Sequence, residues 1–559
     1  MISNSSSSSR PWLNLYPPEF KWSAAEWRRP VYSLLDEIVK KYGSSSAMDF
    51  MGNTTSWREI HKLSCQLARG LQDLGMGRGT RIGICLPNTP YFLAAYYGIL
   101  RTGATAVHIN PLYPERELAH IIEDSGIDVL ITLDLKFIHD KMLVMLQQTR
   151  LNQIIVCPMA DALPLKKKIL FSLFKSSELA RIPNDDKHLP WERMIDNNGH
   201  YEYVDVAPDD IALLQYTGGT TGAPKGAMLT HANIVANTEQ AALWFYNVHP
   251  GQDKMLGVIP FFHVFAMTAV MNLAVRFGLE IIALPRFDLE QTLDTITKEK
   301  PTVFPAVPAI FNAINHADLK GHDLSSLRYC VSGGASLPVE TKKSFEGKTG
   351  CILVEGYGLT EASPVVCVNP LWAENKPGSI GLPLPETDVS LRDPETLKEM
   401  AKGERGELWV KGPQIMKGYW RKPEDTEKTF HDGWLRTGDI AIIDEQGYVF
   451  IVDRLKDMII TNGYNVYPRN VEEVIYLHPA VEECVVAGIP DESRGEIVKA
   501  WIKLKDGASL TQDKLKEFMK DKLSPMEIPK LIEIRNQPLP KTMIGKLSKK
   551  DLLAEEKQK

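Results

Sequence analysis

Short, almost wholly apolar segments alternate with segments of helical periodicity over residues 30–155, and this alternation limits the fold more than any other feature. A strand that is apolar along its whole length is buried on both faces, as in a parallel sheet covered by helices. The pattern predicts helices over 31–42, 57–74, 91–101 and 115–125, and strands over 81–86, 104–109 and 128–132. This part of the chain is therefore predicted to be α/β.

The same rhythm returns over residues 253–370, so we expect a second parallel, helix-covered sheet. Residues 378–452 differ, because glycines divide them into short segments at regular spacing, which favours an antiparallel subdomain, here a small β-barrel. A last group of helix-like and strand-like segments follows Arg454. The strands expected in the second sheet are 279–284, 302–306, 327–332 and 351–355, and the last part should hold helices 471–477 and 510–522 and strands 481–488 and 496–504.

These patterns divide the chain into three parts. Residues 1–30, which include the serine run at 5–9, are expected to be a disordered or extended tail. Residues 31–455 form a large domain that contains the barrel, and 456–559 form a small, mobile α+β domain. No long linker separates the two domains, so we expect a short hinge at Lys456.

A glycine- and threonine-rich loop follows the apolar run 211–214. Glycines allow the backbone to bend and bring its N–H groups close to an anion, while hydroxyls and a lysine add donors suited to phosphate. The alternative without a function is a flexible surface turn, but such a turn does not require three hydroxyls and a lysine. The loop is not a Walker P-loop, because Pro224 would obstruct the helix that this motif opens. The residues of this predicted polyphosphate cradle are Thr217, Gly218, Gly219, Thr220, Thr221, Gly222 and Lys225.

Composition excludes several classes of protein. The net charge of −6 argues against a nucleic-acid partner. Seven scattered cysteines without a CxxC pair fit a reducing compartment and offer neither a disulfide framework nor a zinc site. We find no signal peptide or peroxisomal tripeptide, which favours the cytoplasm. The uncharged stretch 255–275 is long enough to span a bilayer, but Pro260, His263 and Asn272 interrupt it and favour a buried strand and helix.

The loop at 216–226 resembles the phosphate-binding signature of the adenylate-forming superfamily, which includes acyl-CoA synthetases, peptide-synthetase adenylation domains and luciferases. Residues 355–361 resemble its aromatic-Gly-x-Thr-Glu motif, although alone they would be read as a glycine-rich turn with a core tyrosine. The resemblance implies that Tyr357 stacks on adenine, Thr360 meets the α-phosphate, and Glu361, with Thr221, binds Mg²⁺. Glu355, Gly356 and Gly358 complete this nucleotide motif, and Gly333, Gly334 and Ala335 resemble the second wall of the adenine pocket.

Three further motifs follow in the order found in the family. Asp439 and Arg454 would each be read alone as a surface ion pair, but they resemble the family's ribose ligands. Lys456 falls at the family's hinge. In the motif at 540–546, Lys546 is implied to enter the active site and stabilise charge on the substrate carboxylate and the transferring phosphate. The segment with Gly463 and Tyr464 is implied to face CoA when the small domain rotates.

The resemblance implies a two-step reaction with ATP, Mg²⁺ and coenzyme A. A carboxylate attacks the α-phosphorus of ATP to give acyl-AMP and pyrophosphate, and a thiol then takes the acyl group. His263, in a Pro-x-x-His segment, resembles the residue that gates the acyl pocket, although a hydrogen-bonded core histidine is the plain alternative. The run 432–468 looks most like bacterial long-chain fatty acid–CoA ligases, so a medium- or long-chain fatty acid is the expected substrate.

Other functions use the same motifs. An aryl-acid CoA ligase, a ligase that loads a carrier protein, and a catalytically silent acyl-nucleotide sensor remain open alternatives. Homodimers are common in the family. Residues 161–182 contain a basic amphipathic helix that could rest on the inner face of a membrane, or could pack on its own domain with its lysines in water.

Overall fold

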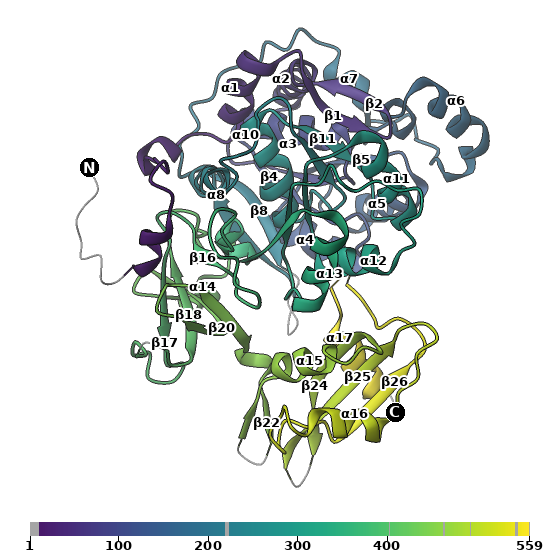
Figure 1. Cartoon of the computed structure of the whole chain (residues 1–559). Helices are drawn as coiled ribbons and strands as arrows, with labels where there is room; N and C mark the ends of the chain where they lie inside the picture. The colour runs from purple at the N-terminus through teal and green to yellow at the C-terminus, as the bar shows by residue number, and fades with distance from the viewer. Residues whose placement is uncertain are drawn as a thin grey trace.

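The computed structural model describes residues 10–217, 223–401, 403–461, 464–491, 494–542 and 546–557. Figure 1 shows two helix-covered sheets in the upper body, a third sheet beside them, and a small domain below, which the chain reaches last. The α/β class and the small C-terminal domain predicted from the sequence are confirmed.

The first sheet has seven strands, and all its neighbours run parallel except β8 and β9, which form a hairpin. Its strands in spatial order are β7 (His188–Pro190), β6 (Gln153–Cys157), β5 (Val129–Leu133), β3 (Arg81–Cys85), β4 (Thr105–His108), β8 (Ile211–Thr217) and β9 (Lys225–Thr230). The cradle loop therefore joins the last two strands.

The second sheet has nine strands, parallel at its centre and antiparallel where β2, β15 and β16 join it. The order is β16 (Leu382–Pro383), β15 (Val365–Val368), β14 (Ile352–Gly358), β13 (Tyr329–Ser332), β12 (Val303–Ala306), β10 (Lys254–Gly257), β11 (Glu280–Ala283), β1 (Ser46–Phe50) and β2 (Asn53–Ser56). β14 runs to Gly358, beyond the predicted end at 355, because its last residues pair with β15.

Helices pack the two sheets into one continuous core. Every residue of α3 is buried, as expected for a helix that is apolar all round. The Tyr97 hydroxyl of α3 donates to Asn272 at 2.9 Å, which ties this helix to the helical segment after β10. The helices of this body are α1 (Tyr32–Tyr42), α2 (Trp57–Asp73), α3 (Pro90–Arg101), α4 (Glu115–Ser125), α5 (Lys136–Gln148), α6 (Leu165–Phe174), α7 (Trp191–Ile195), α8 (His231–Trp244), α9 (Val264–Ala266), α10 (Leu273–Phe277), α11 (Leu289–Glu299), α12 (Pro308–His316) and α13 (Val339–Thr349).

The stretch 255–275 forms β10, α9, a buried π-helical turn (Met267–Asn272) and the start of α10, as the interrupted pattern predicted. None of the helices in the described ranges has both the length and the hydropathy needed to cross a membrane. All seven cysteines are free.

The third sheet is antiparallel, as predicted, and its side chains share one buried cluster with Val366 and Cys367 of β15, while a bridge joins Val449 to Gly381 beside β16. The long strand β20 pairs with three neighbours along its length, whereas β17 pairs with β18 and bridges to Glu399 through Arg392. Its strands are β17 (Asp388–Arg392), β18 (Gly406–Lys411), β20 (Trp434–Ile443), β19 (Phe430–His431) and β21 (Val449–Arg454), and α14 (Pro423–Thr429) lies beside it.

The last part of the chain has its own buried cluster, separate from the main core. Its sheet order is β23 (Tyr464–Val466), β22 (Ile459–Thr461), β25 (Gly495–Leu504) and β24 (Val481–Asp491), with β26 (Leu531–Arg535) parallel to β25. Helix α15 (Pro468–Tyr476) begins three residues before the predicted start, because Pro468 fits the first helical turn. Helices α16 (Gln512–Met519) and α17 (Lys549–Glu556) complete this part.

Candidate active site

A cavity of about 2300 Å³ lies where the two parallel sheets, the third sheet and the C-terminal part meet. It is larger than the roughly 300–1,000 Å³ of a pocket for one small ligand. Described residues from the cradle, the 333–335 loop, the 355–361 motif, the ribose motifs and the C-terminal lysine motif line it. Of the residues singled out in the sequence, the lining includes Thr217, Lys225, His263, Gly333, Gly334, Ala335, Glu355, Gly356, Tyr357, Gly358, Thr360, Glu361, Asp439, Arg454, Lys456 and Lys546.

Some candidates cannot be placed at the cavity. Gly218, Gly219, Thr220, Thr221, Gly222 and Gly463 lie outside the described residues. Tyr464 begins β23 with 62% of its surface exposed, and it is not part of the cavity lining. Tyr464, the described residue of the implied CoA-facing pair, thus lies outside the cavity in this conformation.

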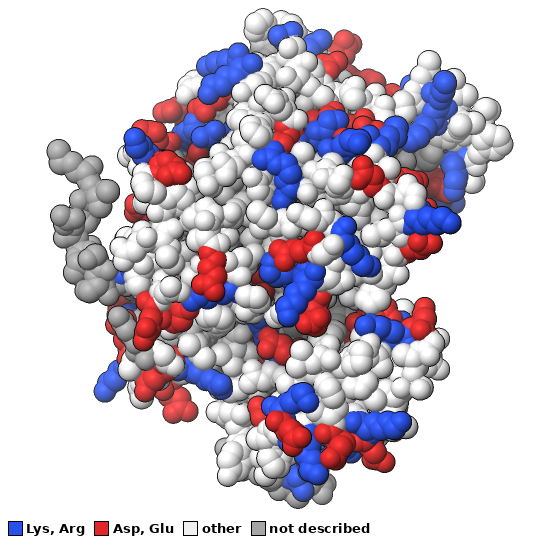
Figure 2. Space-filling model, viewed as in Figure 1, with Lys and Arg blue, Asp and Glu red and all other residues white. Residues whose placement is uncertain are grey.

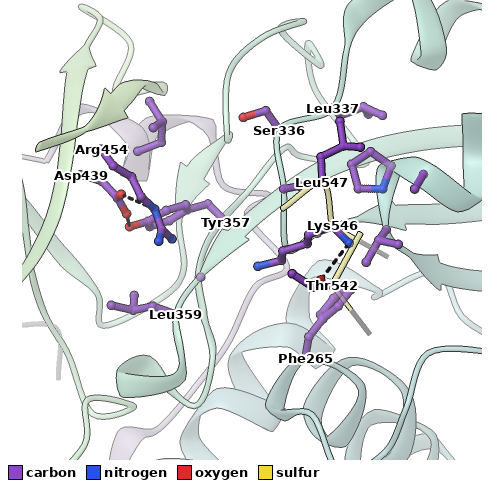
Figure 3. A pocket seen from close by; sticks show the side chains of 18 of the residues that line it. Phe265, Ser336, Leu337, Tyr357, Leu359, Asp439, Arg454, Thr542, Lys546 and Leu547 are labelled. Atoms are coloured by element: carbon purple, nitrogen blue, oxygen red, sulfur yellow. Dashed lines mark hydrogen bonds and ion pairs between the residues drawn. The ribbon is translucent and has the colours of Figure 1, made fainter. Parts of the chain in front are cut away.

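One side of the cavity, the polar wall, is built from residues on three strands. Tyr357 lies near the end of β14, and its hydroxyl donates a hydrogen bond to Asp439 of β20. Arg454, at the end of β21, is the register partner of Asp439, and its Nε lies 3.3 Å from the carboxylate. Figure 3 shows these three side chains in contact. Burial raises the pKa of Asp439, although the Arg454 guanidinium opposes the shift.

The second carboxylate of this wall is Glu361. It lies on a short 3-10 turn that follows β14, and its Oε1 accepts a hydrogen bond from the Tyr419 hydroxyl at 2.6 Å. Lys225 of β9 forms an ion pair of 3.0 Å with Asp425, and its ammonium lies over the Tyr419 ring. Tyr419 and Asp425 were missed in the sequence, because an isolated tyrosine and an isolated aspartate carry no motif.

Glu355 is buried deeper, at the end of the parallel part of β14. Its Oε1 accepts from the Leu337 backbone N–H at 3.2 Å. Burial raises the pKa of Glu355 to about 7, and Arg469 of α15 opposes that shift. Glu355 is therefore a hydrogen-bond partner of the 333–338 loop.

The opposite side, the apolar wall, comes from helices α8 to α10 and the segment before them. His263 caps α9, and its Nδ1 accepts from the Phe265 N–H at 3.3 Å. Burial, with the positive charge of Lys546, lowers the pKa of His263 to about 3, so this imidazole is neutral at physiological pH. The other residues of the apolar wall are Ala241, Trp244, Phe245, Phe262, Val264, Phe265, Ala269 and Leu273.

Lys546 reaches the cavity between the two walls from the C-terminal part. A Cβ built on Gly334, whose φ is +84°, would come within 3.1 Å of Lys546 Cε, so the loop at 333–335 leaves just enough room for this side chain. The loop that carries Lys546 is held by Thr542, whose Oγ1 accepts from the Lys546 N–H at 3.1 Å (Figure 3). Burial and then the charge of Arg454 lower the pKa of Lys546 to about 8.

The arrangement offers several cations, several carboxylates and an aromatic ring beside an apolar surface. A carboxylate oxygen is the hard ligand that Mg²⁺ prefers, and Glu361 presents one on the polar wall, so this residue fits the implied metal. The aromatic ring and the Asp439 carboxylate are suited to a base and to vicinal hydroxyls. The cavity can therefore hold a nucleotide and an apolar acid side by side.

Comparison with known proteins agrees with this geometry. The AMP-binding enzyme family matches residues 35–420, and the AMP-binding enzyme C-terminal domain matches residues 470–546. The chain is 44% identical over 562 residues to a long-chain-fatty-acid–CoA ligase of Bacillus subtilis (strain 168), covering 98% of both chains. It also resembles the crystal structure of the anthranilate CoA ligase AuaEII in complex with anthranoyl-AMP, with a TM-score of 0.84, 25% identity, and coverage of 96% of this chain and 99% of that chain. ATP-bound MatB from Rhodopseudomonas palustris gives a TM-score of 0.82 at 27% identity, covering 94% of this chain and 99% of that one.

Proposed function

The chain belongs to the AMP-binding enzyme family, and on that premise we propose that it is an AMP-forming fatty acid–CoA ligase. It would activate a medium- or long-chain fatty acid with ATP and then join the acyl group to the CoA thiol through a carbon–sulfur bond. The sequence identity is 44% to the Bacillus ligase and 25% to the anthranilate CoA ligase, which supports a fatty acid over an aromatic acid as the substrate.

The position of Lys546 is the observation that carries this proposal. Its ammonium is close enough to Arg454 and Asp439 of the polar wall to be influenced by both, and it lowers the pKa of His263 on the apolar wall. The Lys546 ammonium thus lies where a nucleotide on one side and an acid on the other would react, next to the 333–335 loop. The protein needs no side-chain nucleophile, because the substrate carboxylate is one already.

In the first step, a carboxylate oxygen of the fatty acid attacks the α-phosphorus of ATP, and the bond to pyrophosphate breaks. We propose that Tyr357 stacks on adenine, Asp439 and Arg454 hold the ribose, and Lys225 and Thr360 bind phosphate oxygens. Lys546 stabilises the negative charge that develops in the transition state. Neutral His263 and the apolar wall hold the acyl chain and exclude water.

In the second step, the CoA thiol attacks the acyl carbonyl carbon and AMP leaves. Lys546 occupies the cavity in this structure while Tyr464 lies outside it, which fits a conformation for the first step. We propose that the small domain then rotates about Lys456, withdraws Lys546 and brings Tyr464 and its neighbours to the cavity.

The polar wall also holds a residue that fits Mg²⁺ in the proposed first step. Glu361 would hold the ion, and the bound ion would neutralise charge on the phosphates of ATP. Tyr419 keeps the Glu361 carboxylate in place through its hydroxyl.

Two proposals concern partners. Fatty acids partition into lipid, so we propose that the enzyme works in peripheral contact with a membrane through residues 161–182. We also propose a homodimer, which light scattering would test directly.

The test is pyrophosphate release with Mg²⁺ and ATP, with and without CoA, against acetate, octanoate, palmitate, oleate, benzoate and coumarate. A maximum at octanoate or longer, with acyl-CoA as the product, is the expected result. A maximum at benzoate or coumarate would move the function to an aryl-acid ligase. Acyl-AMP that forms without transfer to CoA would favour a carrier-protein acceptor, and ATP binding without turnover would favour a sensor.

A further inference from the structure

Helix α6 is placed unusually for the connection to which it belongs. It lies between β6 and β7, which are parallel neighbours at the edge of the seven-stranded sheet. A parallel pair needs a crossover, and the crossover helix normally buries its apolar side against the sheet. Figure 1 shows α6 projecting from the body at the upper right. Most of its apolar residues are therefore left outside the core.

The exposures of its side chains make this plain. None of the ten residues of α6 is buried. Residues 165, 169 and 173 are spaced four apart and line one stripe, with 170 and 174 beside it. The exposed fractions are 72% for Leu165, 51% for Ile169, 54% for Leu170, 69% for Leu173 and 76% for Phe174. We call these five residues the outer face of α6.

The other side of the helix holds it to the body. Phe171 packs against the main core, Lys167 Nζ donates to the Met51 carbonyl at 2.8 Å, and Lys168 forms an ion pair of 2.5 Å with Asp161. The orientation of the helix is thus fixed by its own contacts. The outer face points away from the protein because the inner side is anchored.

The charges around the outer face are mainly positive. Helical spacing places Lys166 within the outer face, and Figure 2 shows basic side chains, in blue, around this projection at the upper right. Lys175 follows the helix and pairs with Glu178. An amphipathic helix with bulky apolar residues and lysines is suited to the interface of an anionic bilayer, where the ammonium groups reach the headgroups.

We infer that α6 docks on a bilayer that contains anionic lipids, with its outer face inserted among the acyl chains and its axis along the surface. This inference specifies the helix face and the lipid of the proposed membrane contact. It rests on the proposed function only in the reason for the contact, which is access to fatty acids in the bilayer. The binding itself needs neither ATP nor turnover. Membrane docking and the ligase reaction can therefore succeed or fail separately.

The experiment is flotation of the full chain with vesicles of phosphatidylcholine alone or mixed with phosphatidylglycerol, without nucleotide or CoA. The test variant is Leu170→Glu/Leu173→Glu/Phe174→Glu. The control variant is Leu13→Glu/Tyr203→Glu/Leu531→Glu, which adds the same charge at apolar residues that are exposed by 39%, 76% and 42% outside α6. Circular dichroism and octanoate turnover check that each variant is folded.

The wild-type chain and the control variant should float with the mixed vesicles, and the test variant should bind at least about tenfold more weakly. Binding to pure phosphatidylcholine should be weaker than to the mixture, and higher salt should reduce the difference. Equal binding of the test variant, or no vesicle binding by the wild-type chain, would overturn the inference. A change from dimer to monomer in the test variant, without vesicle binding by the wild type, would assign the outer face to a second copy and would also overturn it.

Discussion

The two walls of the cavity differ in how their side chains are held before any ligand arrives. On the polar wall the charged groups already have partners: Asp439 contacts Tyr357 and Arg454, and Glu361 accepts from Tyr419. On the apolar wall, His263 is the residue singled out for function, and burial keeps it neutral. The rest of that wall offers surface and few directed interactions.

This difference indicates that one wall of the cavity serves the reaction at phosphorus and the other wall determines which acid is preferred. The polar wall fixes the orientation of charged groups, which a reaction at phosphorus requires. The apolar wall can discriminate between acids only by the length and width of their apolar part, because hydrophobic contact is not directional. Changes on the polar wall should alter the rate for every acid, and changes on the apolar wall should alter which acid is preferred.

The largest effect is expected at Lys546, which lies between the walls. Lys546→Ala should lower adenylation by about 10²–10³-fold, because it removes the cation that stabilises the transition state. Pyrophosphate release measures this step. Lys541→Ala is the control, since Lys541 lies in the same loop but pairs with Glu483 at 2.5 Å.

Transfer of the acyl group from synthetic acyl-AMP to CoA should persist in the Lys546→Ala variant. If adenylation were unchanged, the role given to Lys546 would be wrong. If both steps failed together, the separation of the two steps by domain rotation would lose its support.

The next effect would sharpen the contrast between the walls. Ala269 is small and lines the apolar wall, so Ala269→Phe should lower kcat/KM for palmitate by about tenfold through loss of space for the chain. The affinity for ATP should stay the same. Equal losses for palmitate and acetate, measured as acyl-CoA formed, would contradict a wall that selects by chain length.

The dependence of adenylation on pH gives a third test of the two walls. Lys546 must be protonated to act, and its pKa in the free enzyme is about 8, so kcat/KM should fall about tenfold per pH unit above that value. His263 has a pKa of about 3 and should contribute no change between roughly pH 5 and pH 8. A pH profile of adenylation with a step near pH 6.5 that disappears in His263→Ala would show that this histidine titrates in the working enzyme.

The smallest effect is expected at Tyr419. Tyr419→Phe removes one hydrogen bond to Glu361 and should cost about fivefold in adenylation, with a higher Mg²⁺ requirement. Tyr448→Phe is the control, because the Tyr448 hydroxyl donates to the Glu374 carbonyl and Tyr448 does not line the cavity. An unchanged dependence on Mg²⁺ would show that Tyr419 does not position the Glu361 carboxylate.

Much of the polar wall could be predicted from the sequence, because its residues lie in short motifs whose glycines, hydroxyls and charges have a chemical meaning at fixed spacing. Tyr357, Thr360 and Glu361 are neighbours in the chain and remain neighbours in space. Tyr419 could not be found in this way, since it reaches Glu361 from 58 residues away and belongs to no motif.

The sequence by itself determined the order of helices and strands, the two parallel sheets and the polar residues of the cavity, because periodicity and motif chemistry are local. Only the tertiary structure decided that Lys546 lies between the walls and that Tyr464 lies outside the cavity. It also decided that α6 leaves its apolar side uncovered, although its pattern allowed packing on its own domain. The physical reason is that the burial of a side chain depends on which distant segments pack against it. The residues next to it in the chain do not determine which segments those are.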